Sequence, residues 1–225
     1  MANYTIRNGA SGMTSVTANA AITSQRSQIT SPNHREWIKA GKVWSFGTGA
    51  LTTPAAFQTD LVRQTPENMI RVPKGYVVIP LMAQATYEAT GAAVAQILVS
   101  ACNNDPGTAN ISAATAVNVN TRYAGASPAS QCYLTPTGAS GTAPTGVSDL
   151  LRAYQQVDND AVTGSASDKL QFVYNPLAGI GQECVIGDNA GVNAFLFYVA
   201  NGTSSTGFTI VTFAEFTYDE YYAAS

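Results

Sequence analysis

From residue 43 onward, the order of apolar and polar residues predicts β-strands. Apolar residues recur at every second position over 76–87, which is the pattern of a strand with one buried face. The residues that would share that face are Val77, Ile79, Leu81, Ala83, Ala85 and Tyr87. Because Pro80 has no N–H to donate to a sheet, this strand is expected to lie at a sheet edge or to be bulged there.

A second apolar run covers 94–102, and a short link containing Gly91 joins it to the first. A link of this length and composition suits a β-hairpin, so the two runs are expected to pair with each other. The turn-forming sequence of residues 103–107 would then end the second strand.

The C-terminal part of the chain contains two short apolar runs, 169–174 and 182–186, and two longer ones, 194–200 and 208–218. The longer runs flank the Gly-containing segment 201–207 and are expected to meet as antiparallel strands. The residues expected to share one face of the last strand are Phe208, Ile210, Thr212, Ala214, Phe216 and Tyr218. The side chains expected to be buried are Phe195, Phe197 and Phe216.

Signals for α-helix are confined to two short segments. Residues 148–156 form one candidate, which Ser148 could cap at its N-terminus. Residues 33–40 form the other, which Gly41 would end.

Residues 123–148 carry no charge and consist mostly of Gly, Ser, Pro, Thr and Ala. A loop of this length is usually functional or held by a neighbouring molecule. Many short strands separated by Gly- and Pro-containing turns indicate an all-β fold. We therefore expect residues 43–225 to form an antiparallel β-sandwich, a single jelly roll, preceded by an extended N-terminal arm.

The expected arm, residues 1–42, differs from the body in charge and in apolar content. It carries five basic residues and one acidic residue, a net charge of +4, whereas the body carries six basic and thirteen acidic residues, a net charge of −7. Its first 30 residues contain too few apolar side chains to offset the entropy of ordering. It is therefore expected to order against a partner, although a terminus without a role is the alternative. The candidate contacts between subunits are Arg7, Arg26, Arg35, Trp37, Lys39 and Lys42.

Charged residues make up only 11% of the chain, against about 25% in ordinary soluble domains. Ala, Thr, Ser and Gly take their place, so the expected surface is polar but nearly uncharged. No apolar run reaches the roughly 20 residues that span a bilayer, so no membrane contact is expected. The opening residues lack the apolar core of a signal peptide, so export is not expected either.

The sequence offers little catalytic or metal-binding chemistry. The single His34 lies beside the expected arm, and no nucleophile motif, cofactor loop or paired metal-ligand motif occurs. Cys102, Cys132 and Cys184 are too widely separated for a local zinc site and are expected to be free thiols. Asp158 and Asp160 only partly match a calcium loop. We therefore predict no catalytic, cofactor-binding or metal-binding residue, no cofactor, and no enzymatic activity.

The stretch 68–80, which leads into a long apolar strand, resembles strands of viral jelly-roll shell proteins, in particular small virion proteins of bacteriophages. The low-charge, Ala- and Thr-rich body with a polar arm is similar to that group as well. The resemblance implies a capsid, coat or cement protein, made in the host cytoplasm and located in the virion. Its partners would be copies of itself and other virion proteins. Contact between the arm and nucleic acid is not favoured, because dedicated nucleic-acid tails carry denser blocks of Lys and Arg.

The alternative function is a carbohydrate-binding β-sandwich, either a lectin or an adhesive, receptor-binding virion module. Tyr and Trp side chains would then stack on sugars, and residues 123–148 would form the rim of the site. Residues 218–222 contain three Tyr and are candidates either for such a platform or for a terminal peptide that packs on a neighbour.

Overall fold

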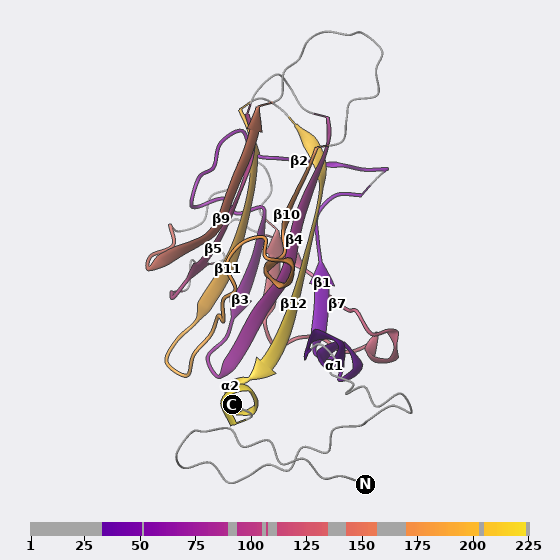
Figure 1. Ribbon diagram of the computed structural model, residues 1–225, viewed down its shortest axis with the longest axis vertical. Coiled ribbons are helices and arrows are strands. Elements are labelled where there is room, and N and C mark those ends of the chain that lie inside the picture. Colours follow the sequence, from indigo (N-terminus) through magenta and orange to yellow (C-terminus); the bar gives the residue numbers. More distant parts are fainter. Residues whose placement is uncertain are drawn as a thin grey trace, which may run out of the picture. The chain divides into compact units, whose positions relative to one another are not determined.

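The computed structural model describes residues 33–50, 52–89, 94–104, 107, 112–134, 143–156, 170–202 and 205–223. Over these residues the chain forms two antiparallel β-sheets that pack face to face, as Figure 1 shows. All the strands belong to the compact unit Trp37–Ser225. The other elements are the helices α1 (Asn33–Lys39) and α2 (Tyr218–Ala223) and the 3-10 turns η1 (Thr121–Tyr123) and η2 (Pro176–Ala178).

The first sheet, sheet I, has the strand order β10–β4–β12–β1–β7, and β2 also pairs with β12. Its strands are β10 (Gln171–Tyr174), β4 (Tyr76–Ala89), β12 (Thr206–Thr217), β1 (Val43–Phe46), β7 (Val117–Asn118) and β2 (Ala55–Ala56). The second sheet, sheet II, has the order β6–β8–β3–β11–β5–β9. Its strands are β6 (Ser112–Ala114), β8 (Gln131–Leu134), β3 (Asn68–Val72), β11 (Asn193–Asn201), β5 (Val94–Cys102) and β9 (Val147–Gln156).

The connections between the sheets are those of a jelly roll. Along the chain, β1 lies in sheet I, β3 in sheet II, β4 in sheet I and β5 in sheet II. Strand β9 stays beside β5, and β10, β11 and β12 then alternate between the sheets again. Two sheets connected in this way define the jelly roll, which confirms the fold class expected from the sequence. Residues 1–32 of the expected arm lie outside the described residues, whereas residues 33–42 are described.

Both hairpins expected from the sequence are wrong. The runs 76–87 and 94–102 do form β4 and β5, but the two strands lie in different sheets. Likewise β11 pairs with β3 and β5, whereas β12 pairs with β4 and β1. A short Gly-containing link permits a crossover to the opposite sheet as readily as a return beside the same strand, so the turn sequence did not decide between them.

Of the two expected helices, one forms. Helix α1 begins at Asn33, and Gly41 follows its end with a positive φ of 71°. Residues 148–156 are instead strand β9, which pairs with β5 along its length. At strand spacing, Leu151 and Ala153 pack against the core while Arg152 and Tyr154 are exposed. The pairing that β5 offers therefore overrides a weak local helix preference.

Strand β4 contains the bulge expected near Pro80. Its partner β12 pairs Thr212 with Met82 but Phe213 with Pro80, which leaves Leu81 as the extra residue. The bulge exchanges the faces of β4. Ala83, Ala85 and Tyr87 point into the core between the sheets, whereas Leu81 and Ile79 point to the outer face of sheet I. The single shared face expected for 77–87 is therefore wrong.

The predicted loop 123–148 and the predicted strand 182–186 also differ from the structure. Residues 131–134 form β8, which pairs with β3, and Val147 already belongs to β9. In 182–186, only Ile186 makes a β-bridge, with Val78 of β4. The predicted strand 169–174 is present as β10, from Gln171.

The core between the sheets is aromatic and aliphatic, and all nine residues of β11 are buried. The expected burial of Phe195, Phe197 and Phe216 is confirmed. Phe216, however, lies on the outer face of sheet I, where Phe208, Ile210, Thr212 and Ala214 also lie. The face of β12 that enters the core carries Val211 and Phe213.

We expect Phe197→Ala to lower the free energy of unfolding by about 3–5 kcal/mol, because it leaves a cavity in the core between the sheets. Urea unfolding followed by circular dichroism measures the change. The exposed Val117→Ala serves as the control and is expected to change stability by less than ~0.5 kcal/mol. A Phe197→Ala protein as stable as the wild type would contradict this position of the core.

Candidate interaction surfaces

One end of sheet I is covered on its outer face by helical residues. The buried side chains there, called the cap cluster, are Val43, Leu81, Ala214 and Phe216. Trp37 of α1 packs edge-on against Phe216, with ring centroids 5.3 Å apart, and Tyr221 of α2 packs against the same ring at 6.0 Å. Helices α1 and α2 therefore add a small apolar cluster on the outer face of sheet I, outside the core between the sheets.

Trp37 and Lys42, both candidate arm contacts, make contacts within the chain. Trp37 packs against the cap cluster. Lys42 Nζ forms an ion pair with Glu220 at 2.8 Å and lies 5.9 Å from the centre of the Phe216 ring. These contacts fix the start of β1 to α2. Arg35 and Lys39 of α1 are exposed, whereas Arg7 and Arg26 lie outside the described residues.

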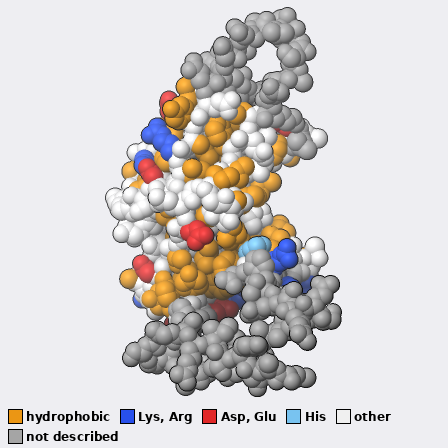
Figure 2. All heavy atoms as spheres, in the orientation of Figure 1, with side chains coloured by type: hydrophobic (Ala, Val, Ile, Leu, Met, Phe, Trp, Pro, Cys, Tyr) orange, Lys and Arg blue, Asp and Glu red, His pale blue; other side chains and the backbone are white. Residues whose placement is uncertain are grey.

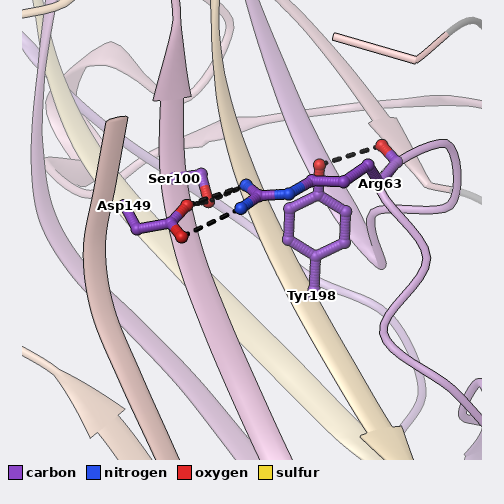
Figure 3. Close-up of polar contacts among 4 residues, drawn as sticks. All are labelled: Arg63, Ser100, Asp149 and Tyr198. Carbon is purple, nitrogen blue, oxygen red and sulfur yellow. Dashed lines mark hydrogen bonds and ion pairs between the residues drawn. The ribbon is translucent and has the colours of Figure 1, made fainter. Parts of the chain in front are cut away.

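The outer face of sheet II is covered in part by the β2–β3 loop, residues 57–67. Leu61 of this loop packs against the apolar outer face of the sheet. Arg63 binds Asp149 of β9 through two hydrogen bonds, of 2.7 and 2.9 Å, and also donates to Ser100 Oγ. Tyr198 of β11 donates its hydroxyl to the carbonyl of Arg63 at 3.0 Å (Figure 3).

This polar cluster holds the loop in place and offers no obvious nucleophile. Ser100 is fully buried and donates its hydroxyl to Asp149, and no imidazole is part of the cluster. The hydrogen bond from Arg63 holds the pKa of Asp149 below its usual value, so this carboxylate stays charged and cannot serve as a general acid near neutral pH. The sequence had not singled out any of these residues.

The buried carboxyl groups Glu67 and Glu215 have very different surroundings. Glu215 of β12 accepts hydrogen bonds from the backbone N–H groups of Ala129 and Ser130, both at 2.7 Å. Glu67 is only 2% exposed, and its Oε2 has no hydrogen-bond partner among the described residues. Burial without such partners raises the pKa of Glu67 to about 8.

Cys102, Cys132 and Cys184 form no disulfide; Cys102 and Cys132 are buried, and Cys184 is half-buried. Burial raises the pKa of Cys132 to about 12 and that of Cys184 to about 11. In the described part of the chain, no three His, Cys, Asp or Glu side chains converge to hold a metal ion. Asp158 and Asp160, the partial match to a calcium loop, lie outside the described residues.

We expect the native thiols to react slowly with Ellman's reagent at pH 8, because all three are at least half-buried and because the pKa values of Cys132 and Cys184 are raised. Unfolding the chain in guanidinium should make all three react quickly. EDTA is expected to leave the melting temperature unchanged. Rapid labelling of Cys132 in the native protein would contradict its position in the core.

Several large apolar side chains are exposed away from the helices. Leu177, Ile180 and Val185 are 53%, 45% and 43% exposed, and all three lie in the segment between β10 and β11. Figure 2 shows hydrophobic side chains over much of one face of the molecule. On sheet II, Tyr154 is 74% exposed and stands opposite Gln96 in the β5–β9 register.

No protein-family model matches the chain, and neither a curated protein nor a solved structure matches it. Among the described helices, none has the length and apolar character that crossing a bilayer requires.

Proposed function

We propose that the chain is a self-associating structural subunit of a viral capsid shell, that of a bacteriophage, as a coat or cement protein. The observation that carries the proposal is a jelly-roll body with few charges and rigidly held aliphatic side chains at its surface. In this proposal, its partners are copies of itself and other virion proteins, and its location is the virion.

The scarcity of charge supports the proposal because a shell subunit is surrounded by neighbours over much of its surface. The cores of protein interfaces are depleted in Lys, Glu and Asp relative to the rest of the surface. Leu177, Ile180 and Val185 of one short segment are all exposed, and partner binding would cover them. The opposite net charges of residues 1–42 and 43–225 also favour contact between the arm of one copy and the body of the next.

The number of copies of the chain in its assembled particles tests the proposal. Analytical ultracentrifugation and negative-stain electron microscopy of the full chain, over a range of protein and salt concentrations, are expected to show closed particles of many copies. A chain that remains a monomer or a small oligomer under all these conditions, alone and with particles that lack it, would contradict the proposal.

A carbohydrate-binding module is the second candidate, and Tyr154 is the observation that favours it. An exposed ring on a sheet, beside the amide of Gln96, offers a stacking surface with a polar neighbour. A glycan array tests it: binding that Tyr154→Ala abolishes, without loss of melting temperature, would support this function. A wild-type protein that binds no glycan on the array would contradict the carbohydrate-binding function.

A further inference from the structure

The segment 175–186, called the closing segment, runs from the end of β10 past β9 to β4 and is held at each step. Asn175 and Ile180 exchange backbone hydrogen bonds of 2.9 and 3.0 Å, which closes a tight loop around η2. Gln182 N–H donates to the carbonyl of Leu150 in β9 at 3.1 Å. Ile186 exchanges two hydrogen bonds with Val78 of β4. The segment thus links the edge of sheet II to sheet I.

Side-chain packing adds to these backbone links. The Tyr174 hydroxyl donates to the carbonyl of Gln182 at 2.7 Å, and Ile186 is buried in the core. Gly181 has a φ of 93°, and a Cβ there would lie 2.5 Å from the Tyr174 ring, so the chain passes the ring closely. The closing segment is therefore a rigid part of the sandwich wall.

From this wall, Leu177, Ile180 and Val185 point outward, and we call them the aliphatic stripe. Each keeps between 43% and 53% of its surface exposed. The closing segment carries one charge, the exposed Glu183, and the chain contains no Lys or Arg after residue 169. Because the closing segment is already rigid, it loses little conformational entropy when a partner binds. The stripe therefore suits a partner whose own segment becomes ordered on binding.

We propose that the aliphatic stripe binds residues 1–32 of a neighbouring copy of this chain. The inference rests on the proposed shell function and names the surface that the arm of the next subunit contacts. Residues 1–32 contain Arg7 and Arg26 and no acidic residue, which complements Glu183. Their apolar side chains are spread along the segment, as in Ile6, Val16, Ile22 and Ile29. Thirty-two residues can span up to ~105 Å, which is enough to reach the next subunit.

The folded body of a second copy fits the stripe less well. A stable interface between folded domains buries about 800 Å² on each partner, and three aliphatic side chains supply only a small part of that area. A two-fold contact through the stripe would also bring two Glu183 carboxylates together. A peptide that lies along the stripe needs neither a large flat area nor a second carboxylate.

Photo-crosslinking in the full chain tests the inference. The variant Ile180→p-benzoylphenylalanine is prepared in unlabelled and in ¹⁵N-labelled form. The two forms are mixed in equal amounts and assembled, and the particles are then irradiated and digested. Mass spectrometry is expected to show crosslinks to residues 1–32, half of them of mixed isotope composition, because the arm comes from another copy. The control places the same probe at Val117 of β7, where crosslinks to residues 1–32 are expected to be about tenfold fewer.

A second measurement uses the double variant Leu177→Ser and Ile180→Ser. Both side chains are exposed, so the melting temperature is expected to stay unchanged, while the protein concentration needed for assembly rises about tenfold, the equivalent of about 1.4 kcal/mol. Particles that form with crosslinks from Ile180 mainly to residues 33–225, or with none, would overturn the inference and leave the shell function standing. A wild-type chain that forms no particles alone and joins no particles that lack it would overturn both.

Discussion

A chain that lacks residues 1–30 is expected to fold into the same β-sandwich but to assemble poorly, with the concentration needed for assembly raised by at least about tenfold. Every described strand lies at residue 43 or beyond, so the deletion removes none of them. In the proposed shell, the deleted residues bind a neighbouring copy, so their removal takes away contact area between subunits. Circular dichroism and analytical ultracentrifugation measure folding and assembly separately.

The end point of this deletion follows from the structure. Trp37 packs on Phe216, and Lys42 pairs with Glu220, so both must remain. A deletion of residues 1–42 would strip the cap cluster and confuse loss of stability with loss of assembly. Deleting residues 1–30 therefore removes most of the arm and keeps the residues that cover sheet I.

The matched control keeps the arm and replaces Arg7 and Arg26 with Gln. Exposed ion pairs are worth about 0–1 kcal/mol each, so this control and raised salt should weaken assembly only modestly. Strong salt dependence together with co-purifying nucleic acid would favour an arm that faces a genome. A truncated chain that assembles as well as the wild type would show that the arm has no role in assembly.

Glu67→Gln is expected to remove a large pH dependence of stability. The pKa of Glu67 is about 8 in the folded chain and near 4.5 in the unfolded chain. The folded state therefore keeps a proton that the unfolded state releases as the pH rises above 4.5. The stability from the protonated group is complete below pH 4.5 and is lost as the pH rises towards 8, by about 3–5 kcal/mol in total.

Urea unfolding at pH 4.5, 6 and 8 measures this loss in the wild type and in Glu67→Gln. The difference in free energy of unfolding between the two proteins should shift in favour of Glu67→Gln by about 3–5 kcal/mol between the lowest and highest pH. Asp60→Asn, a change at an exposed carboxyl group, is the control and should alter stability by less than ~0.5 kcal/mol at each pH. Parallel curves for wild type and Glu67→Gln would show that the Glu67 carboxyl is not buried as described.

The candidate surfaces were only partly accessible from the sequence. Trp37 and Lys42 stood out as an aromatic and a basic residue near a change in composition, yet their partners Phe216 and Glu220 lie far along the chain. Arg63 and Asp149 gave no local signal, because their ion pair depends on how the β2–β3 loop crosses β5 and β9. The raised pKa of Glu67 depends on burial by residues distant in sequence, so no pattern around residue 67 could reveal it.

The sequence by itself determined the all-β class, the positions of β4, β5, β11 and β12, the helix before Gly41, and a deviation near Pro80. These features depend on side-chain alternation, apolar runs and backbone restrictions that act over a few residues. Only the tertiary structure decided that β4 and β5 lie in opposite sheets, that residues 148–156 form a strand, and that the faces of β4 exchange at Leu81. Pairing depends on which distant strand offers free N–H and C=O groups, and facing depends on which surface another element covers. Both are decided by contacts between residues far apart in the chain, and therefore only when the whole sandwich is assembled.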